Sequence, residues 1–247
     1  MNMSFWRSVY TVIDESDVVI EIIDSRMPEL SRNSQIKEIV DRGGKDFIIV
    51  FNKIDLIPGR YLDKLKKENK GSFFISVKKG KGIKELRLKL QMTSKKSKFP
   101  RLRVGFVGYP NVGKSSIVNA LIRRASAKVA KKAGTTRGIQ WISFSNLKIL
   151  DSPGVIPIDE WDEIKLALIN VKDPGKLKDV EKAALAIIEI FVKSGSKIYG
   201  LKGEDSYELF NEIAIKKGHL LKKGEIDEQR AAASIVRDWQ NGKLKLQ

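Results

Sequence analysis

An eight-residue glycine-rich segment, Gly108–Ser115, holds the residues best suited to chemistry. Its spacing, Gly-x-x-x-x-Gly-Lys-Ser, is that of a phosphate-binding loop. Gly108 and Gly113 allow backbone angles that a side chain would forbid, so successive amide groups turn toward phosphate oxygens at the start of the following helix. Lys114 is then expected to reach the β- and γ-phosphates of a nucleotide, and Ser115 to ligate magnesium. The residues expected to contact the nucleotide here are Tyr109, Pro110, Asn111, Val112, Gly113, Lys114, Ser115 and Ser116.

The chain on either side of this loop has the patterns of a strand and a helix. Residues 102–107 form a mostly apolar run that is typical of a buried strand, and residues 115–124 carry apolar side chains at helical spacing. An ordinary glycine turn is the alternative, but it does not call for this order of strand, loop and helix. The context therefore favours a nucleotide site.

A second segment, Asn52-Lys53-x-Asp55, follows an apolar strand pattern and predicts that the base is guanine. Guanine presents an N1–H and an exocyclic amine that one carboxylate can accept together, whereas adenine lacks that amine. We therefore assign Asp55 to guanine recognition. Asn52 is expected either to bind the O6/N7 edge of the base or to fix a neighbouring loop, and the aliphatic stem of Lys53 to cover the base.

A short turn, Ser76-Val77-Lys78, follows the next predicted strand. In the same site, this turn would add a backbone amide for the O6 atom of guanine. Taken alone, the three residues are also compatible with a plain turn at the end of a strand.

Two further loops are expected to complete the phosphate and magnesium site. Asp151 would hold a magnesium-bound water, and the amide of Gly154 would sense the γ-phosphate. Thr136 is the expected second protein ligand of magnesium, with Thr135 as the alternative, although either threonine alone also fits an ordinary polar loop. We assign catalysis to Lys114, Thr136 and Gly154.

The order of apolar runs predicts an α/β fold for residues 1–156. Strands alternating with helices indicate a mostly parallel six-stranded sheet with right-handed crossovers. The expected strands lie at residues 17–24, 47–51, 72–75, 102–107, 139–144 and 147–150. Residues 92–101 lack periodicity and are expected to form a linker.

Residues 157–247 show only helical spacing, which predicts a small all-helical domain. The expected helices lie at residues 163–170, 180–193, 206–217 and 228–241.

The composition adds a strong prediction about partners. The formal net charge is +17, and residues up to Ile156 hold 31 Lys and Arg against 14 Asp and Glu, whereas the remainder holds 16 of each. The excess is concentrated at 60–103 and 123–137, which favours contact with the phosphate backbone of a nucleic acid over a merely solubilising surface. No cysteine and no long apolar run occur, so we expect a cytoplasmic protein that does not enter a membrane.

The order of the nucleotide-binding motifs is circularly permuted. Ordinary GTPases begin with the phosphate loop, whereas here Asn52-x-x-Asp55 and Ser76-x-Lys78 precede it and Asp151 follows it. Together with Ile23-Asp-Ser-Arg-Met-Pro28 and, more loosely, Ile235-Val-Arg-Asp238, this order resembles the circularly permuted ribosome-assembly GTPases of the YlqF/YawG family. The resemblance covers nearly the whole chain and implies a GTPase domain followed by a helical domain that contacts ribosomal RNA.

Three positions bear on the hydrolysis that this resemblance implies. Some members carry a histidine near the N-terminus that has been linked to hydrolysis, but the first ten residues here hold none, and His219 is expected to be a surface or packing residue. Val155 stands where many GTPases place a glutamine that orients water, so we expect slow intrinsic hydrolysis. Asn111 resembles the asparagine that helps to hold potassium in potassium-stimulated GTPases.

We therefore expect a GTPase that binds GTP or GDP with magnesium and acts as a monomer on ribosomal RNA and the large ribosomal subunit. The first alternative is a GTP-gated RNA-binding switch with negligible catalysis, acting on tRNA or another RNA. A weaker alternative is a structural RNA-binding protein with a degenerate nucleotide site, although every expected guanine and phosphate residue is present.

Overall fold

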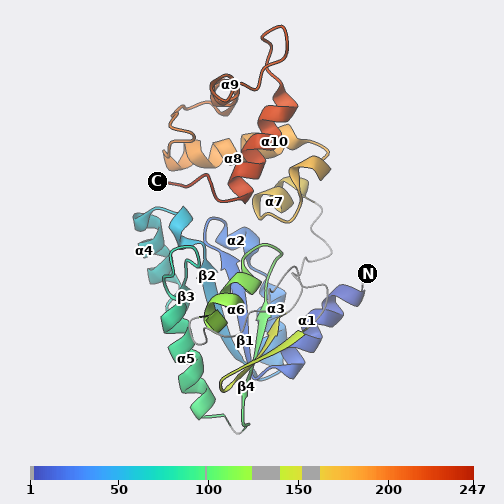
Figure 1. The fold of residues 1–247 in the computed structure, drawn as a ribbon, viewed down its shortest axis with the longest axis vertical. Helices are drawn as coiled ribbons and strands as arrows, with labels where there is room; N and C mark the ends of the chain where they lie inside the picture. The colour runs from blue at the N-terminus through green and yellow to red at the C-terminus, as the bar shows by residue number, and fades with distance from the viewer. Residues whose placement is uncertain (1–2, 98, 124–139, 152–161) are drawn as a thin grey trace. The chain divides into compact units, whose positions relative to one another are not determined.

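The computed structural model describes residues 3–97, 99–123, 140–151 and 162–247, and the chain forms two compact units (Figure 1). The larger unit comprises Met1–Asp55 and Leu62–Asp159, and the smaller unit comprises Leu56–Tyr61 and Glu160–Gln247. The smaller unit thus includes a short segment from the first half of the sequence in addition to C-terminal residues.

A six-stranded sheet organises the larger unit, with the strand order β3-β2-β1-β4-β6-β5. Every neighbouring pair is parallel except β5 and β6, which confirms the predicted α/β fold with a mostly parallel sheet. In chain order, strands β1 to β6 span Val18–Asp24, Asp46–Asn52, Phe73–Phe74, Leu102–Val107, Gln140–Phe144 and Leu147–Asp151.

Strand β1 lies between β2 and β4, and all seven of its residues are buried. Successive side chains point to opposite faces, so a strand covered on both faces needs apolar residues at nearly every position. The Val- and Ile-rich sequence of β1 meets that need. Its parallel register pairs Asp24 with Asn52 of β2, so the polar ends of the two strands lie side by side.

Helices α1 (Met3–Glu15) and α3 (Ser34–Arg42) share one apolar core with the sheet. Helices α5 (Ile83–Lys95) and α6 (Lys114–Arg123) pack against each other and contact β6. The buried residues of the α1/α3 core are Val9, Val12, Ile13, Val19, Ile36, Val40, Val107 and Leu150. The remaining helical segments in this half of the sequence are α2 (Pro28–Ser31), α4 (Gly59–Glu68) and the 3₁₀ turn η1 (Ile54–Leu56).

Two local predictions need correction. Helix α5 continues to Lys95, so the first four residues of the linker expected at 92–101 are helical. The hydroxyl of Thr93 donates to the carbonyl of Lys89, a bond that satisfies a polar side chain inside a helix. The segment with Arg26 and Pro28 that follows the first predicted strand is expected from the sequence to be a loop, but it contains helix α2. Proline fits the first turn of a helix without losing a backbone hydrogen bond.

The smaller unit contains the four predicted helices, α7 (Glu163–Leu168), α8 (Val180–Ser194), α9 (Ser206–Lys216) and α10 (Glu228–Gln240). An aspartate caps the start of each one by accepting backbone N–H groups. Phe191 and Trp239 pack edge to face in its core. No helix in the described part of the chain is both long and apolar enough to cross a membrane.

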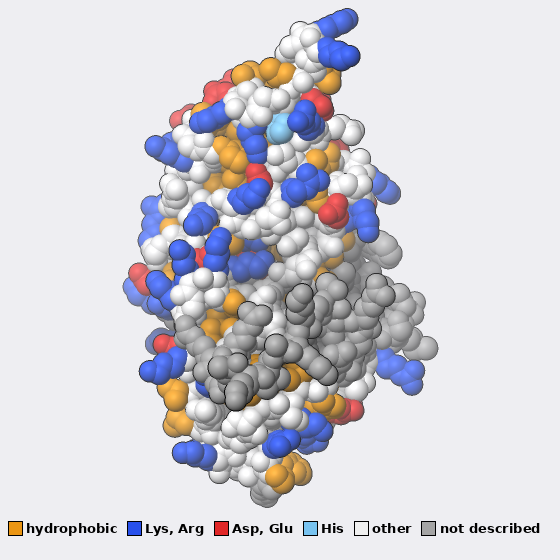
Figure 2. All heavy atoms as spheres, in the orientation of Figure 1, with side chains coloured by type: hydrophobic (Ala, Val, Ile, Leu, Met, Phe, Trp, Pro, Cys, Tyr) orange, Lys and Arg blue, Asp and Glu red, His pale blue; other side chains and the backbone are white. Residues whose placement is uncertain are grey.

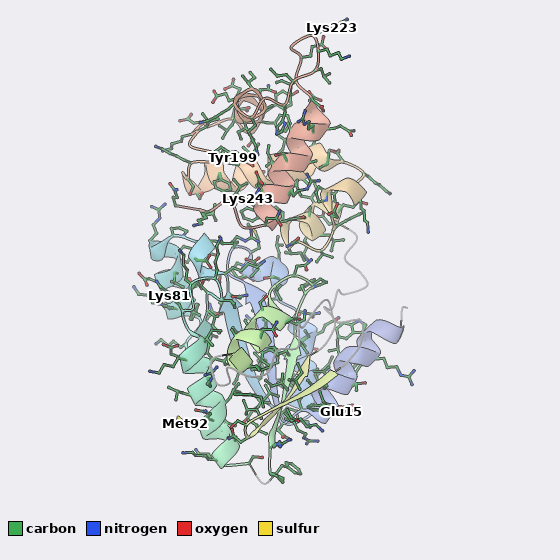
Figure 3. All side chains as sticks on the ribbon, viewed as in Figure 1. Glu15, Lys81, Met92, Tyr199, Lys223 and Lys243 are labelled. Atoms are coloured by element: carbon green, nitrogen blue, oxygen red, sulfur yellow. The ribbon has the colours of Figure 1, made fainter. Side chains whose placement is uncertain are left out.

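Asp238 ties together three segments of the smaller unit. It accepts hydrogen bonds from the hydroxyl of Tyr199 and the ammonium groups of Lys217 and Lys243, at 2.8 to 2.9 Å. Figure 3 labels Tyr199 and Lys243. Burial by itself raises the pKa of Asp238, but these donors lower it below the usual range. This residue, noted in the sequence for a loose resemblance only, therefore stabilises the fold of the helical unit.

Glu21 is a buried carboxyl group in the middle of β1. Its Oε1 atom accepts the backbone N–H of Asn33 at 2.9 Å, whereas Oε2 and the Nδ2 atom of Asn33 have no hydrogen-bond partner among the described residues. Burial raises the pKa of Glu21 to about 7, against the opposing effects of the Asn33 N–H and the charge of Arg32.

The raised pKa of Glu21 makes folding stability depend on pH. Between the unfolded pKa near 4.5 and the folded value of about 7, the folded state holds a proton that the unfolded state releases. The stability contributed by protonated Glu21 is therefore complete below pH 4.5 and is lost as the pH rises through 7. The free energy of unfolding of the wild type should fall between pH 5 and 8. In Glu21→Gln this fall should be about 1–3 kcal/mol smaller, because glutamine does not titrate.

Urea unfolding at several pH values measures this difference. The exposed Glu85→Gln variant is the matched control and should follow the wild-type pH profile. Parallel profiles for Glu21→Gln and the wild type would show that the Glu21 carboxyl group does not titrate in this range.

Candidate guanine-nucleotide site

The predicted nucleotide-binding segments meet at one edge of the sheet. The phosphate loop follows β4, and the Asn52–Asp55 segment begins at the last residue of β2, with β1 between these two strands. Parallel strands bring their carboxyl ends to the same edge, where α/β folds bind ligands. Segments that lie far apart in the sequence therefore become neighbours in the larger unit.

The backbone of the phosphate loop has the unusual angles that its glycines allow. Gly108 and Gly113 have φ angles of 137° and 105°, and Asn111 also has a positive φ of 59°. The Lys114 side chain is buried, and its ammonium donates to the carbonyl oxygens of Gly108 and Tyr109 at 2.9 and 2.8 Å. The lysine charge is thus held within the loop, beside the start of helix α6.

Asn52 joins the two motifs directly. Its Nδ2 atom donates to the carbonyl of Val112 in the phosphate loop at 2.8 Å. A side chain at Gly113 would place its Cβ only 2.2 Å from that Nδ2 atom, so the contact requires glycine at this position. Of the two roles expected for Asn52, the geometry supports the one in which it fixes a neighbouring loop.

Asp55 and Ser76 also lie together, as expected for the two ends of a base site. The Ser76 hydroxyl donates to Oδ1 of Asp55 at 2.6 Å, and the backbone N–H of Lys79 donates to the same hydroxyl at 3.0 Å. This arrangement orients the carboxylate of Asp55 and closes the turn that contains Val77 and Lys78. The Ser76 segment is therefore attached to Asp55, the residue that the sequence analysis assigned to guanine recognition.

The sequence assigned no role to the turn after β1, although the structure brings it into the site. The Ser25 hydroxyl donates to the carbonyl of Asn52 at 2.6 Å, and the Asp24 carboxylate accepts from Lys53 at 2.8 Å. Charged residues at and directly after the end of a buried, mostly apolar strand were the available signal, because a strand end at this edge of a parallel sheet faces the ligand.

The magnesium side of the site is described only in part. Ser115 lies in the first turn of α6, and Asp151 ends β6 in register with Phe106 of β4. A hydroxyl and a carboxylate supply the oxygen atoms that magnesium prefers, so these two residue types fit the ion. Thr135, Thr136, Gly154 and Val155, to which the sequence analysis also gave roles, lie outside the described residues.

The single histidine, His219, belongs to the helical unit. Its two ring nitrogens are buried and have no hydrogen-bond partner among the described residues. Burial and then the charges of Lys217 and Arg230 lower its pKa.

Comparisons with known proteins relate the chain to GTPases. The family model described as "50S ribosome-binding GTPase" matches residues 103–202. A GTP-binding protein of Methanocaldococcus jannaschii, MJ1464, is 37% identical over 96% of this chain and 65% of its own length. Nucleolar GTP-binding protein 2 of Saccharomyces cerevisiae is 32% identical over 97% of this chain and 52% of its own length. The chain thus spans about half to two-thirds of these relatives.

The structural comparison identifies the architecture. The crystal structure of GNP-bound YlqF from T. maritima has a TM-score of 0.70 and 28% sequence identity, and the match covers 98% of this chain and 95% of that one. Fold and motif order therefore define a circularly permuted P-loop GTPase. The chain belongs to the circularly permuted GTPase family that includes YlqF.

The position of Asp55 generates a test of base recognition. Asp55→Asn replaces an acceptor by an amide whose donors would face the donors of guanine, so GTP binding should weaken by about 2–3 kcal/mol. Affinity for xanthosine triphosphate, which offers an acceptor in place of the amine, should rise. Calorimetric titration of both nucleotides measures the change.

The exposed Asp63→Asn variant on α4 is the control and should leave both affinities unchanged. An unaltered preference of Asp55→Asn for GTP would refute the assignment of Asp55.

Proposed function

We propose that this protein hydrolyses GTP to GDP and phosphate and uses its nucleotide state to control binding to an assembling large ribosomal subunit. The observation that carries the proposal is the attachment of the guanine-recognition segment to the phosphate loop through Asn52 and Val112. Family membership supports the GTPase activity, and the description of the matching family model supports the ribosomal partner. We place this activity in the cytoplasm.

Catalysis in this proposal is mostly positioning and neutralisation of charge. Lys114 would leave the carbonyls of Gly108 and Tyr109 and bind the β- and γ-phosphates. The amides of the phosphate loop would bind phosphate oxygens at the start of α6. Ser115, Thr136 and Asp151 would hold magnesium, which supplies positive charge to the phosphates, and Asn111 would help to hold a potassium ion.

The charge distribution supports contact with ribosomal RNA. The net charge of +17 falls entirely on residues up to Ile156, whereas residues from Pro157 onward are net neutral. Figure 2 shows Lys and Arg side chains of the described residues dispersed over the visible surface. We propose that the GTPase unit supplies most of the salt-sensitive affinity and that the helical unit supplies fit and direction.

A GTP-gated switch with negligible catalysis, acting on tRNA or another RNA, is the second candidate. The presence of Val155 where many GTPases have glutamine favours it. The two candidates predict different GTP turnover in the presence of ribosomal subunits.

Turnover therefore tests the catalytic part of the proposal. Hydrolysis by the protein alone should be slow, and large ribosomal subunits should accelerate it at least about tenfold. Potassium should increase the rate over sodium, and Asn111→Ala should remove that increase because the cation loses a ligand. Phosphate release measured under single-turnover conditions reports each rate.

Asn69→Ala, which removes a side-chain amide on the segment after α4, is the matched control and should keep the potassium effect. No acceleration by subunits, in a protein that still binds RNA, would favour the switch over the GTPase. Fast turnover in sodium that is insensitive to Asn111→Ala would contradict both the slow intrinsic rate and the potassium site.

Binding to the large subunit should depend on the nucleotide. A non-hydrolysable GTP analogue and GDP should give affinities that differ by roughly 5- to 150-fold, with the reciprocal effect of subunits on nucleotide affinity. Neutralising Lys66, Lys67 and Lys70 together should make affinity less dependent on salt. The slope of log affinity against log salt concentration should become shallower by about one for each RNA phosphate that is no longer bound. Co-sedimentation across a salt series measures both effects.

Neutralising Lys216, Lys222 and Lys223, which are also exposed but lie among the residues from Pro157 onward, whose net charge is zero, is the matched control. Equal affinities in the two nucleotide states would contradict the switch. A salt slope that falls only in the control variant would place the main RNA contact on the helical unit.

A further inference from the structure

The turn after β1 carries a buried carboxylate whose hydrogen-bonding capacity is fully used. Oδ1 of Asp24 accepts from the backbone N–H and the Nε of Arg26, both at 3.1 Å. Oδ2 accepts from Nη2 of Arg26 and from Nζ of Lys53, both at 2.8 Å. Two cations from different segments thus share one anion.

This group of charges is withdrawn from solvent. The side chains of Asp24 and Arg26 are 1% and 0% exposed, and that of Lys53 is 19% exposed. Burial alone raises the pKa of Asp24, but the charges of Arg26 and Lys53 outweigh it and lower the pKa well below the usual range. Asp24 is therefore ionised and available to Lys53 at neutral pH.

The backbone of Lys53 has an unfavourable conformation, which contacts from neighbouring residues must hold in place. Its φ of 64° lies in the left-handed region, which side chains other than glycine rarely adopt. The preceding residue is held from the same turn, because the N–H and the hydroxyl of Ser25 both donate to the carbonyl of Asn52. The segment 24–26 thus fixes the course of the chain directly before Asp55.

Arg26 fixes the position of the Asp24 carboxylate independently of Lys53. Its guanidinium binds Asp24 through two parallel hydrogen bonds, a geometry that defines the position of both oxygens. Lys53 is bound to an oxygen that is already held in place. The direction of the lysine stem is therefore set by the turn after β1 rather than by the lysine alone.

We propose that Asp24 is a positioning residue for guanine nucleotides: it anchors the ammonium of Lys53 so that the aliphatic stem lies along the face of the base. This inference rests on the guanine site proposed above. Asp24 touches no part of the nucleotide in this scheme. It slows nucleotide release without contributing to the choice of guanine, which remains with Asp55.

Three variants separate this role from a general effect on folding. Asp24→Asn removes the anionic partner of Lys53. Lys53→Met keeps an apolar stem of similar length and removes only the ammonium, while Asp24 stays paired with Arg26. The double variant, Asp24→Asn with Lys53→Met, completes a double-mutant cycle. Release of fluorescent GDP and affinities for GDP and inosine diphosphate, which lacks the exocyclic amine, are measured for each.

Each single variant should release GDP about 10- to 100-fold faster, the range expected for the loss of a hydrogen bond between charged groups. The double variant should release GDP no faster than the more impaired single variant, because both changes break one interaction. The ratio of affinities for GDP and inosine diphosphate should stay at the wild-type value. Should Asp24→Asn fail to fold, the same two measurements on Lys53→Met decide the question.

Asp17→Asn is the matched control, because Asp17 forms an ion pair with Arg103 immediately before the same strand, at its opposite end. It should change thermal stability but not GDP release. Wild-type release from Lys53→Met, additive effects in the double variant, or a changed ratio between the two diphosphates would overturn the inference. Failure of the wild type itself to bind GDP would instead refute the proposed function.

Discussion

The hydrogen bond from Asn52 to the carbonyl of Val112 is the contact on which the nucleotide site depends. It joins the end of β2, just before Asp55, to the loop that is predicted to hold the phosphates. The bond needs the side chain of Asn52 to cross the position above Gly113, where a methyl group would approach to 2.2 Å. A conformationally permissive glycine and a short amide side chain therefore define one structural unit, although they belong to different motifs.

The circular permutation leaves this unit intact because it changes the chain connections and not the order of strands in the sheet. Strand β1 still lies between β2 and β4, and its register sets Asp24 beside Asn52. The turn after β1 is thereby available to support the base-recognition segment. The same permutation places the residues of the helical unit after Asp151 in the sequence.

Each unit has a buried or partly buried carboxylate that binds two cations, but the two clusters have different roles. In the GTPase unit, buried charges stand at the functional edge, where Arg26 and Lys53 share Asp24. In the helical unit, Lys217 and Lys243 share Asp238, and that cluster joins segments of the fold. Both carboxylates bind more than one cation, which compensates their removal from water. Only the first cluster touches residues that were assigned to a nucleotide.

The sequence by itself determined the nucleotide motifs, the permuted order, the mostly parallel sheet and the helical C-terminal region. These features follow from local spacing: the phosphate loop spans eight residues, and the strands and helices show their own periodicities. The end of α5 was missed because polar residues such as Thr93 break the apolar pattern while bonding to their own helix. Helix α2 was missed because it has only four residues.

The tertiary structure alone decided how the motifs act on one another. The Asn52–Val112 bond joins residues 60 positions apart, and the Lys53–Asp24 pair joins residues 29 positions apart. Both depend on which strands are neighbours and on their register, and a single sequence does not encode these in any local pattern. For the same reason the role of Asn52 stayed open between base and loop until β2 and β4 were placed on either side of β1.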